Sequence, residues 1–304
     1  MLHELLAVGL AQSDAYKKGD DEAVSHGSNV RYLGRRRSGG GLRSLHNTLR
    51  PMEQQLRAAL QLVQPYPDGV VEVPAVIPGT AFFPGGRGLW GEGTDAPEFP
   101  VGKIMVLGHN FDTEEKYHIS FRRGSEDVET NHTWKNLVQL LTSVRIAPKE
   151  VFFTNFFMGL IAARKEEEET TEIKGKKKKV KNTGEFPGAR DPEFVQRCQT
   201  FFLKQVEVQH PRLILVLGLQ VPKHLSSLSD CLSPWAKATS IAQLDPQHGL
   251  IRDVRFSGID HSTTVVVLTH PCYRRRNAKY RRYAGLKSEE AEIRLIKDAL
   301  NSTH

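Results

Sequence analysis

Three polar side chains that suit hydrogen-bond chemistry directly follow apolar runs of the sequence: Asn110, Asn155 and His270. An amide offers a donor and an acceptor together, and an imidazole exchanges its proton near neutral pH. A fourth apolar run ends at Gly218. The runs cover residues 103–108, 151–154, 213–217 and 264–269. Because open α/β sheets bind ligands at the carboxyl ends of their strands, we expect these residues to share one pocket.

A basic segment follows His270. Residues 270–283 contain six arginines and lysines, three tyrosines and no acid. Cations that contact phosphates and rings that stack on bases suit nucleic acid, although a basic surface helix is the simpler alternative. The position directly after a buried strand favours nucleic-acid binding. The candidate contacts are Tyr273, Arg274, Arg275, Arg276 and Lys279.

Residues 74–93 combine glycine and proline with aromatic residues, including Phe82 and Phe83. Glycine and proline disfavour a regular element here. The aromatic side chains either line a pocket and stack on a base, or anchor the loop to the core. The sequence leaves both interpretations open.

The surrounding pattern predicts an α/β protein. Three of the apolar runs are followed by segments long enough for crossover helices, among them helices beginning near His132 and at Asp191-Pro192. In the first of these helices Thr133 is a plausible cap, and Trp134 is expected in the core. A terminal helix is expected from Ser288, and a small strand at 251–256. Right-handed crossovers then give a three-layer α/β/α sandwich around a central, mainly parallel sheet of four strands.

Two stretches read as additions to this domain. Residues 1–45 resemble a flexible basic arm, which is either a tether for nucleic acid or dispensable. Residues 46–304 form the α/β domain, with a charged insertion at 164–190. Such insertions are usually solvated, although the lysines at 176–179 could reach a phosphate backbone.

Composition excludes several classes. Lys and Arg number 42 against 35 acids, and this modest basic excess permits a polyanion partner. Three scattered cysteines give neither a disulfide framework nor a four-cysteine metal site, and no ligand spacing predicts a catalytic metal. No apolar run reaches the roughly 20 residues of a membrane helix. We therefore expect a cytoplasmic protein, associated with the nucleoid if bacterial.

The order of these motifs resembles the uracil-DNA glycosylase superfamily. Its first motif is similar to Gly108-His109-Asn110-Phe111-Asp112, and its last, His-Pro-Ser, is similar to His270-Pro271-Cys272. Phe111 and Asp112 stand where the family has Pro-Gly or Pro-Tyr. The segment that ends in Asn155 resembles the strand that carries the uracil-reading asparagine. The resemblance covers roughly residues 73–300.

The resemblance implies a DNA glycosylase that removes uracil or a related deaminated base from DNA, acts as a monomer and needs no cofactor. His270 would donate to the departing base, and Asn110 would position the attacking water unless Asp112 is the base. Asn155 would read the base edge. Further base contacts would come from Gly108, His109 and Phe111, and from a stacking ring at Phe82, Phe83 or Phe121. Tyr273 or Arg274 would fill the gap that the flipped base leaves in the DNA helix.

Two other interpretations remain. The altered first motif is compatible with a nucleic-acid-binding member of this fold that has little or no catalytic activity. A small-molecule or nucleotide hydrolase on a generic α/β sheet is the third, because fold alone does not decide function.

Overall fold

The computed structural model describes residues 51–74, 82–84, 102–163 and 186–301. The chain divides into a unit of residues 1–47 and a unit of residues 48–304, and every described residue belongs to the second. The basic arm expected at 1–45 lies outside the described residues. So do residues 164–185 of the charged insertion and most of the aromatic loop at 74–93.

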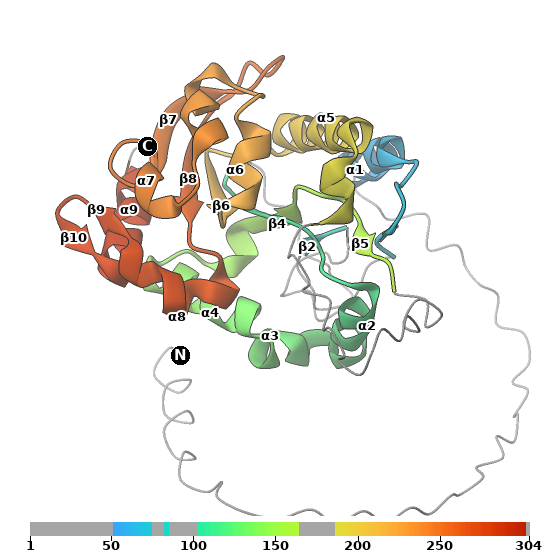
Figure 1. Cartoon of the computed structure of the whole chain (residues 1–304), viewed down its shortest axis with the longest axis horizontal. Helices are drawn as coiled ribbons and strands as arrows, with labels where there is room; N and C mark the ends of the chain where they lie inside the picture. Colours follow the sequence, from blue (N-terminus) through green and yellow to red (C-terminus); the bar gives the residue numbers. More distant parts are fainter. Residues whose placement is uncertain (1–50, 75–81, 85–101, 164–185, 302–304) are drawn as a thin grey trace, which may run out of the picture. The chain divides into compact units, whose positions relative to one another are not determined.

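A mainly parallel sheet with the strand order β2-β4-β3-β6-β8-β7 forms the centre of this unit (Figure 1). The four central strands are parallel to one another: β3 (Ile104–Gly108), β4 (Val151–Asn155), β6 (Leu213–Leu217) and β8 (Ser262–Leu268). They correspond to the four apolar runs of the sequence. The predicted α/β class is confirmed, and the order 4-3-6-8 follows from crossover connections.

The sheet has six strands rather than the four expected. Parallel β2 (Phe82–Phe83) adds to one edge, and antiparallel β7 (Leu250–Arg255) adds to the other. The strand β2 could not be predicted, because two residues among glycines and prolines are too few to show the alternation of a strand. The small strand expected at 251–256 does form, and it joins the main sheet.

Helices cover both faces, which confirms the three layers. One core contains side chains of α1 (Pro51–Leu60), α5 (Pro192–Gln209) and α6 (Gln220–Leu225). The other contains side chains of α4 (His132–Ser143) and α9 (Ser288–Asn301). Alternate strand residues supply the two cores: Met105 and Leu107 face the first, and Ile104 and Val106 face the second.

The main helices begin where their caps permit. Asp191 accepts a hydrogen bond from the Phe194 backbone N–H at 2.9 Å, and Pro192 occupies the first turn of α5, as the sequence predicted. Helix α4 is capped by Asn131, which accepts from the Thr133 N–H at 2.9 Å. The sequence had favoured Thr133 as this cap, whereas the helix begins one residue earlier, at His132.

Shorter elements complete the fold. The remaining helices are α2 (Glu114–Arg123), α3 (Asp127–Thr130), α7 (Ile241–Leu244) and α8 (Arg274–Asn277). Two antiparallel pairs are β1 (Val70–Val71) with β5 (Leu160–Ile161), and β9 (Arg282–Tyr283) with β10 (Leu286–Lys287). The 3-10 turns are η2 (Gln61–Val63), η3 (Gly124–Glu126), η4 (Pro148–Glu150), η6 (Pro187–Arg190), η7 (Asp230–Lys237), η8 (Pro271–Tyr273) and η9 (Ala278–Tyr280). Within the described ranges, no helix is long and apolar enough to cross a bilayer.

Candidate active site

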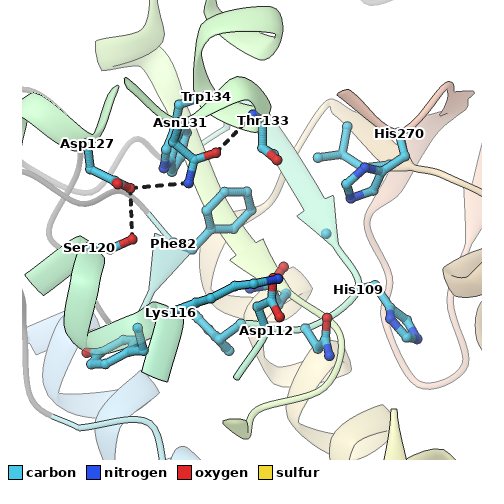
Figure 2. Close-up of a pocket in the computed structure, with 16 residues that line it drawn as sticks. Phe82, His109, Asp112, Lys116, Ser120, Asp127, Asn131, Thr133, Trp134 and His270 are labelled. Atoms are coloured by element: carbon cyan, nitrogen blue, oxygen red, sulfur yellow. Dashed lines mark hydrogen bonds and ion pairs between the residues drawn. The ribbon is translucent and has the colours of Figure 1, made fainter. Parts of the chain in front are cut away.

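A pocket opens at the carboxyl ends of the central strands (Figure 2). Its volume is about 230 Å³. That volume is far above the roughly 10–15 Å³ needed by one water and below the roughly 300–1,000 Å³ of drug-sized sites. The structure thus brings Asn110, Asn155 and His270, which are widely separated in the sequence, to one cavity. The lining residues are Phe82, Gly108, His109, Asn110, Phe111, Asp112, Lys116, Tyr117, Ser120, Asp127, Asn131, Thr133, Trp134, Asn155, Leu217 and His270.

Gly108 makes room for the Asn155 amide. The two residues are register partners across the β3–β4 ladder. A Cβ added to Gly108 would collide with Asn155 Oδ1, and it would lie 3.2 Å from Phe82 Cε1. Asn155 is 4% exposed, so its amide is desolvated where it faces the cavity. A buried amide of this kind stabilises a ligand that satisfies it and disfavours one that does not.

Backbone pairing between β3 and β4 continues beyond both strands and fixes the loop that carries Asn110. Phe156 N–H donates to the Gly108 carbonyl and Phe157 N–H to the His109 carbonyl, both at 2.9 Å. Ile161 N–H donates to the Asp112 carbonyl, also at 2.9 Å. These three bonds therefore fix the position of the loop relative to the segment that follows β4.

The Asp112 carboxylate accepts two hydrogen bonds at the start of helix α2. Its backbone is left-handed, with a φ of 69°, a conformation that aspartate tolerates better than most residues. Its Oδ1 accepts from the Thr113 N–H at 2.9 Å, and its Oδ2 lies 2.7 Å from Lys116 Nζ. Both oxygens thus already have partners at the pocket wall.

His270 presents a defined nitrogen to the cavity. The backbone N–H of Cys272 donates to His270 Nδ1 at 3.3 Å, so Nδ1 carries a lone pair and a neutral ring carries its proton on Nε2. Burial lowers the pKa of His270 below its ordinary value, and the negative charge of Asp112 opposes this. Gly218, at a φ of 80°, lets the ring approach, since an added Cβ would lie 3.2 Å from His270 Cβ. His270 is therefore a neutral hydrogen-bond donor at pH 7.

His109 is held neutral in an aromatic cluster. Its ring lies edge-on to Phe157, with centroids 5.3 Å apart. The pKa of His109 is lowered to about 4, mainly by burial and to a smaller extent by nearby His224 and His270, and a hydrogen bond with the Asn110 side chain opposes the shift. His109 thus contacts Asn110 and joins the loop to the apolar core.

Of the three candidate stacking rings, only Phe82 lines the pocket. It packs against Trp134 and Phe153, with centroids 4.8 and 5.8 Å away. Phe83 is 1% exposed in the opposite core layer, because adjacent residues of a strand point to opposite faces. Phe121 is 53% exposed on the outside of α2. Neither Phe83 nor Phe121 can stack on a base in this cavity.

A polar wall opposite His270 was not found from the sequence. Asp127 Oδ2 accepts from Ser120 Oγ at 2.9 Å and from Asn131 Nδ2 at 3.4 Å, and Thr133 lies beside this network (Figure 2). These residues come from α2, α3 and α4. Their sequence is mixed and polar without a motif, and only the Thr133-Trp134 pair, predicted as a cap and a core residue, gave a local signal.

The basic segment divides into buried and exposed side chains. Arg274 was a candidate DNA contact, but its side chain is 8% exposed and its Nε donates to Glu292 Oε2 at 2.9 Å. Its NH1 lies 3.2 Å from Glu289 Oε2. Arg274 therefore forms its ion pairs with acidic residues of α9. The other four candidates, Tyr273, Arg275, Arg276 and Lys279, are exposed.

Arg281 belongs to the same buried network. Its guanidinium donates twice to the Val267 carbonyl at 3.0 Å and pairs with Asp245 at 3.0 Å. Glu292 Oε1 accepts from the Thr269 N–H at 2.6 Å. The network therefore joins the end of β8, the basic segment and α9 directly beside His270.

The fold and the pocket define an α/β protein with a ligand site at its strand ends. In the described part of the chain, no group of three histidine, cysteine, aspartate or glutamate side chains is placed to hold a metal ion. A model of the uracil DNA glycosylase superfamily matches residues 100–298. The chain belongs to this superfamily, as the resemblance predicted. A search among curated proteins found no match.

Proposed function

We propose that this protein is a DNA glycosylase that releases uracil, or a related deaminated base, from DNA by hydrolysis of the N-glycosidic bond. The observation that carries the proposal is the convergence of Asn110, Asn155, His270 and Phe82 on one cavity of about 230 Å³. A base inside a duplex cannot reach such a cavity, so the nucleotide must be flipped out of the stack.

The polar groups fit a single flipped base. Phe82 offers a ring face on which the base can stack, and the desolvated Asn155 amide can pair with both a donor and an acceptor on its edge. Cleavage leaves the bonding electron pair on the departing base and positive charge on the sugar. The Nε2–H of a neutral His270 donates to the resulting anion, and preorganised donors of this kind supply a large share of a rate enhancement.

Asn110 is the group that positions the attacking water. It lines the same pocket as His270. The water that it holds adds to the sugar carbon, and the proton of that water passes to solvent. We assign Asp112 a positioning role, because its oxygens accept from the Thr113 N–H and from Lys116 Nζ, and both contacts hold the carboxylate at the pocket wall.

DNA reaches the pocket across the exposed part of the basic segment. Tyr273 is 53% exposed, and its ring centroid lies 5.8 Å from that of His270. A ring there can fill the space that the flipped nucleotide leaves. Arg275, Arg276 and Lys279 provide positive charge for the phosphates on either side.

The direct test is base release from uracil-containing oligonucleotides, single- and double-stranded, detected as alkali-labile abasic sites. We expect release by the full chain and a loss of at least about 100-fold in Asn110→Ala and His270→Ala. Asn301→Ala and His132→Ala are matched controls, because both residues are exposed and outside the pocket lining. No release from either substrate, or equal rates in all four variants, would reject the proposal.

The alternative is a DNA-binding member of the superfamily without base release. The observation that favours it is Asp112, whose left-handed backbone and paired carboxylate differ from the family's Pro-Gly or Pro-Tyr turn. It predicts salt-sensitive DNA binding that Arg275→Ala and Arg276→Ala weaken, with no abasic product. Activity in the wild-type chain would exclude it.

A further inference from the structure

Three aromatic side chains are exposed by more than half in the described part of the chain: Phe121 at 53%, Tyr273 at 53% and Tyr280 at 57%. All three lie on segments that contribute to the pocket or continue directly from it. Tyr273 and Tyr280 follow His270, and Phe121 is adjacent to Ser120, a residue of the polar wall. Single exposed rings are common on protein surfaces, but a ring beside a ligand site can stack on a part of the ligand that extends beyond the cavity.

Helix α2 presents one outward face beside the pocket. Positions three and four apart are neighbours on a helix, so His118, Phe121 and Arg122 share this face, and all three are exposed. The adjoining face carries Tyr117, which is buried and four residues before Phe121, and Ser120, and both of these residues line the cavity. The same helix therefore forms a wall of the pocket and an aromatic, basic surface outside it.

The charge of this face suits a polyanion at its C-terminal end. The acids of α2 lie in its first turn, Glu114 and Glu115, whereas Arg122 and Arg123 lie in its last. Arg123 is 3.7 Å from Asp127, but Arg122 forms no ion pair with any described residue. A cation next to an exposed ring is the combination that binds single-stranded nucleic acid.

The two exposed aromatic surfaces lie on opposite sides of the pocket. Figure 2 shows Lys116 and Ser120 of α2 on one side of Phe82 and His270 on the other. In Figure 1, α2 and α8 lie at opposite ends of the band that α8, α4, α3 and α2 form. A strand with one nucleotide in the pocket would therefore extend over α2 in one direction and over η8 and α8 in the other.

We propose that the α2 face formed by His118, Phe121 and Arg122 is a second DNA-binding surface, on which Phe121 stacks against an unpaired base flanking the flipped nucleotide on the side opposite Tyr273. This inference rests on the proposed function in taking DNA as the ligand and one flipped nucleotide as the occupant of the pocket. It does not require base release.

The test is fluorescence anisotropy with labelled single strands of about 15 nucleotides, within the ~4–16 nucleotide range of single-strand sites. Each strand contains one 2′-fluoro-deoxyuridine, which resists cleavage. We expect Phe121→Ala to raise the Kd roughly tenfold, about 1.4 kcal/mol, and Phe121→Tyr to restore binding. Leu62→Ala, which removes another exposed apolar side chain far from the pocket lining, should leave the Kd unchanged.

Trimmed strands locate the contact. When the nucleotides on one side of the analogue are removed, Phe121→Ala should no longer change the Kd, whereas Tyr273→Ala should still change it. When the nucleotides on the other side are removed, Tyr273→Ala should lose its effect and Phe121→Ala should keep it. An unchanged Kd in Phe121→Ala would overturn the inference and would mean that this face binds a protein partner or nothing. The same dependence on trimming in both variants would also overturn it. Phe121-dependent binding without base release would reject the glycosylase and leave this surface standing.

Discussion

The backbone N–H of Cys272 donates to Nδ1 of His270 at 3.3 Å, and this contact determines which nitrogen of the ring can donate into the pocket. The side chain of residue 272 takes no part in it. The serine of the family motif can therefore be replaced by cysteine without changing the tautomer of the neighbouring histidine.

Cys272→Ser should consequently retain base release within about threefold of the wild-type rate, whereas His270→Gln should lose about 100- to 1,000-fold, the usual effect of removing one donor at a developing anion. Single-turnover rates at saturating enzyme measure both. A large loss in Cys272→Ser would show that the thiol itself takes part.

The pH dependence of activity should follow from a neutral His270. Burial lowers the pKa of this histidine, so the neutral ring, which accepts from the Cys272 N–H at Nδ1 and donates through Nε2, already predominates at pH 7 and persists below the ordinary histidine value of about 6.5. Protonation of Nδ1 removes this contact with Cys272. The single-turnover rate should therefore stay level from pH 8 to about 6.5 and fall only in more acidic solution. A rate that rises as the pH drops through 6.5 would indicate a protonated imidazole instead.

The stability of the protein should decrease in acid through His109. Its pKa is about 4 when folded and about 6.5 when unfolded, so the unfolded chain binds the proton first. The stabilisation is complete above pH 6.5 and is lost as the pH falls to about 4. Urea unfolding at several pH values measures this loss, and His109→Phe should make it smaller. An equal slope in the variant would contradict the assignment.

Gly108→Ala should impair the site more than the fold. The new methyl would occupy the position of Asn155 Oδ1, and moving the amide removes its alignment with the base. We expect base release to fall about 100-fold, with a stability cost of about 1–3 kcal/mol for the overpacked position. Gly258 has a φ of 73° and an added Cβ there would meet no atom within 4 Å, so Gly258→Ala measures backbone strain without a collision. Gly108 is not among the glycines of positive φ, so Gly108→Ala should show the collision without that strain.

Arg274 and Arg276 are close in sequence but should respond oppositely to alanine substitution. Arg274→Ala leaves the buried Glu292 without its closest cation and should lower the free energy of unfolding by about 3–5 kcal/mol. Arg276→Ala should leave stability unchanged and reduce the salt dependence of single-strand binding by about 0.7 in slope. Urea unfolding and anisotropy titrations at several salt concentrations distinguish the two.

The sequence predicted the parallel sheet because each central strand is a continuous apolar run buried on both faces. It also placed Asn110, Asn155 and His270 at strand ends, where parallel topology gathers residues. Their catalytic and binding roles remain predictions. The edge strand β2 was not predicted, since it has only two residues. The strand β7 was predicted, but its pairing with the main sheet, which is irregular near Asp253, was not.

Contacts that depend on tertiary packing could not be read from the sequence. Arg274 and Arg276 are equivalent in composition, and only the position of Glu292 on α9 decides which one is buried. Similarly, Phe82 and Phe83 are identical residues, and the pleat of a two-residue strand decides which ring faces the cavity. The Ser120–Asp127–Asn131 wall has no motif because its geometry comes from three separate helices.

Backbone hydrogen bonds from Phe156, Phe157 and Ile161 to residues 108, 109 and 112 fix one wall of the pocket. A pocket whose shape already fits the base that the proposed reaction releases should let that base dissociate slowly. The freed base should therefore compete with fresh substrate, and product inhibition would set the pace of repeated turnover.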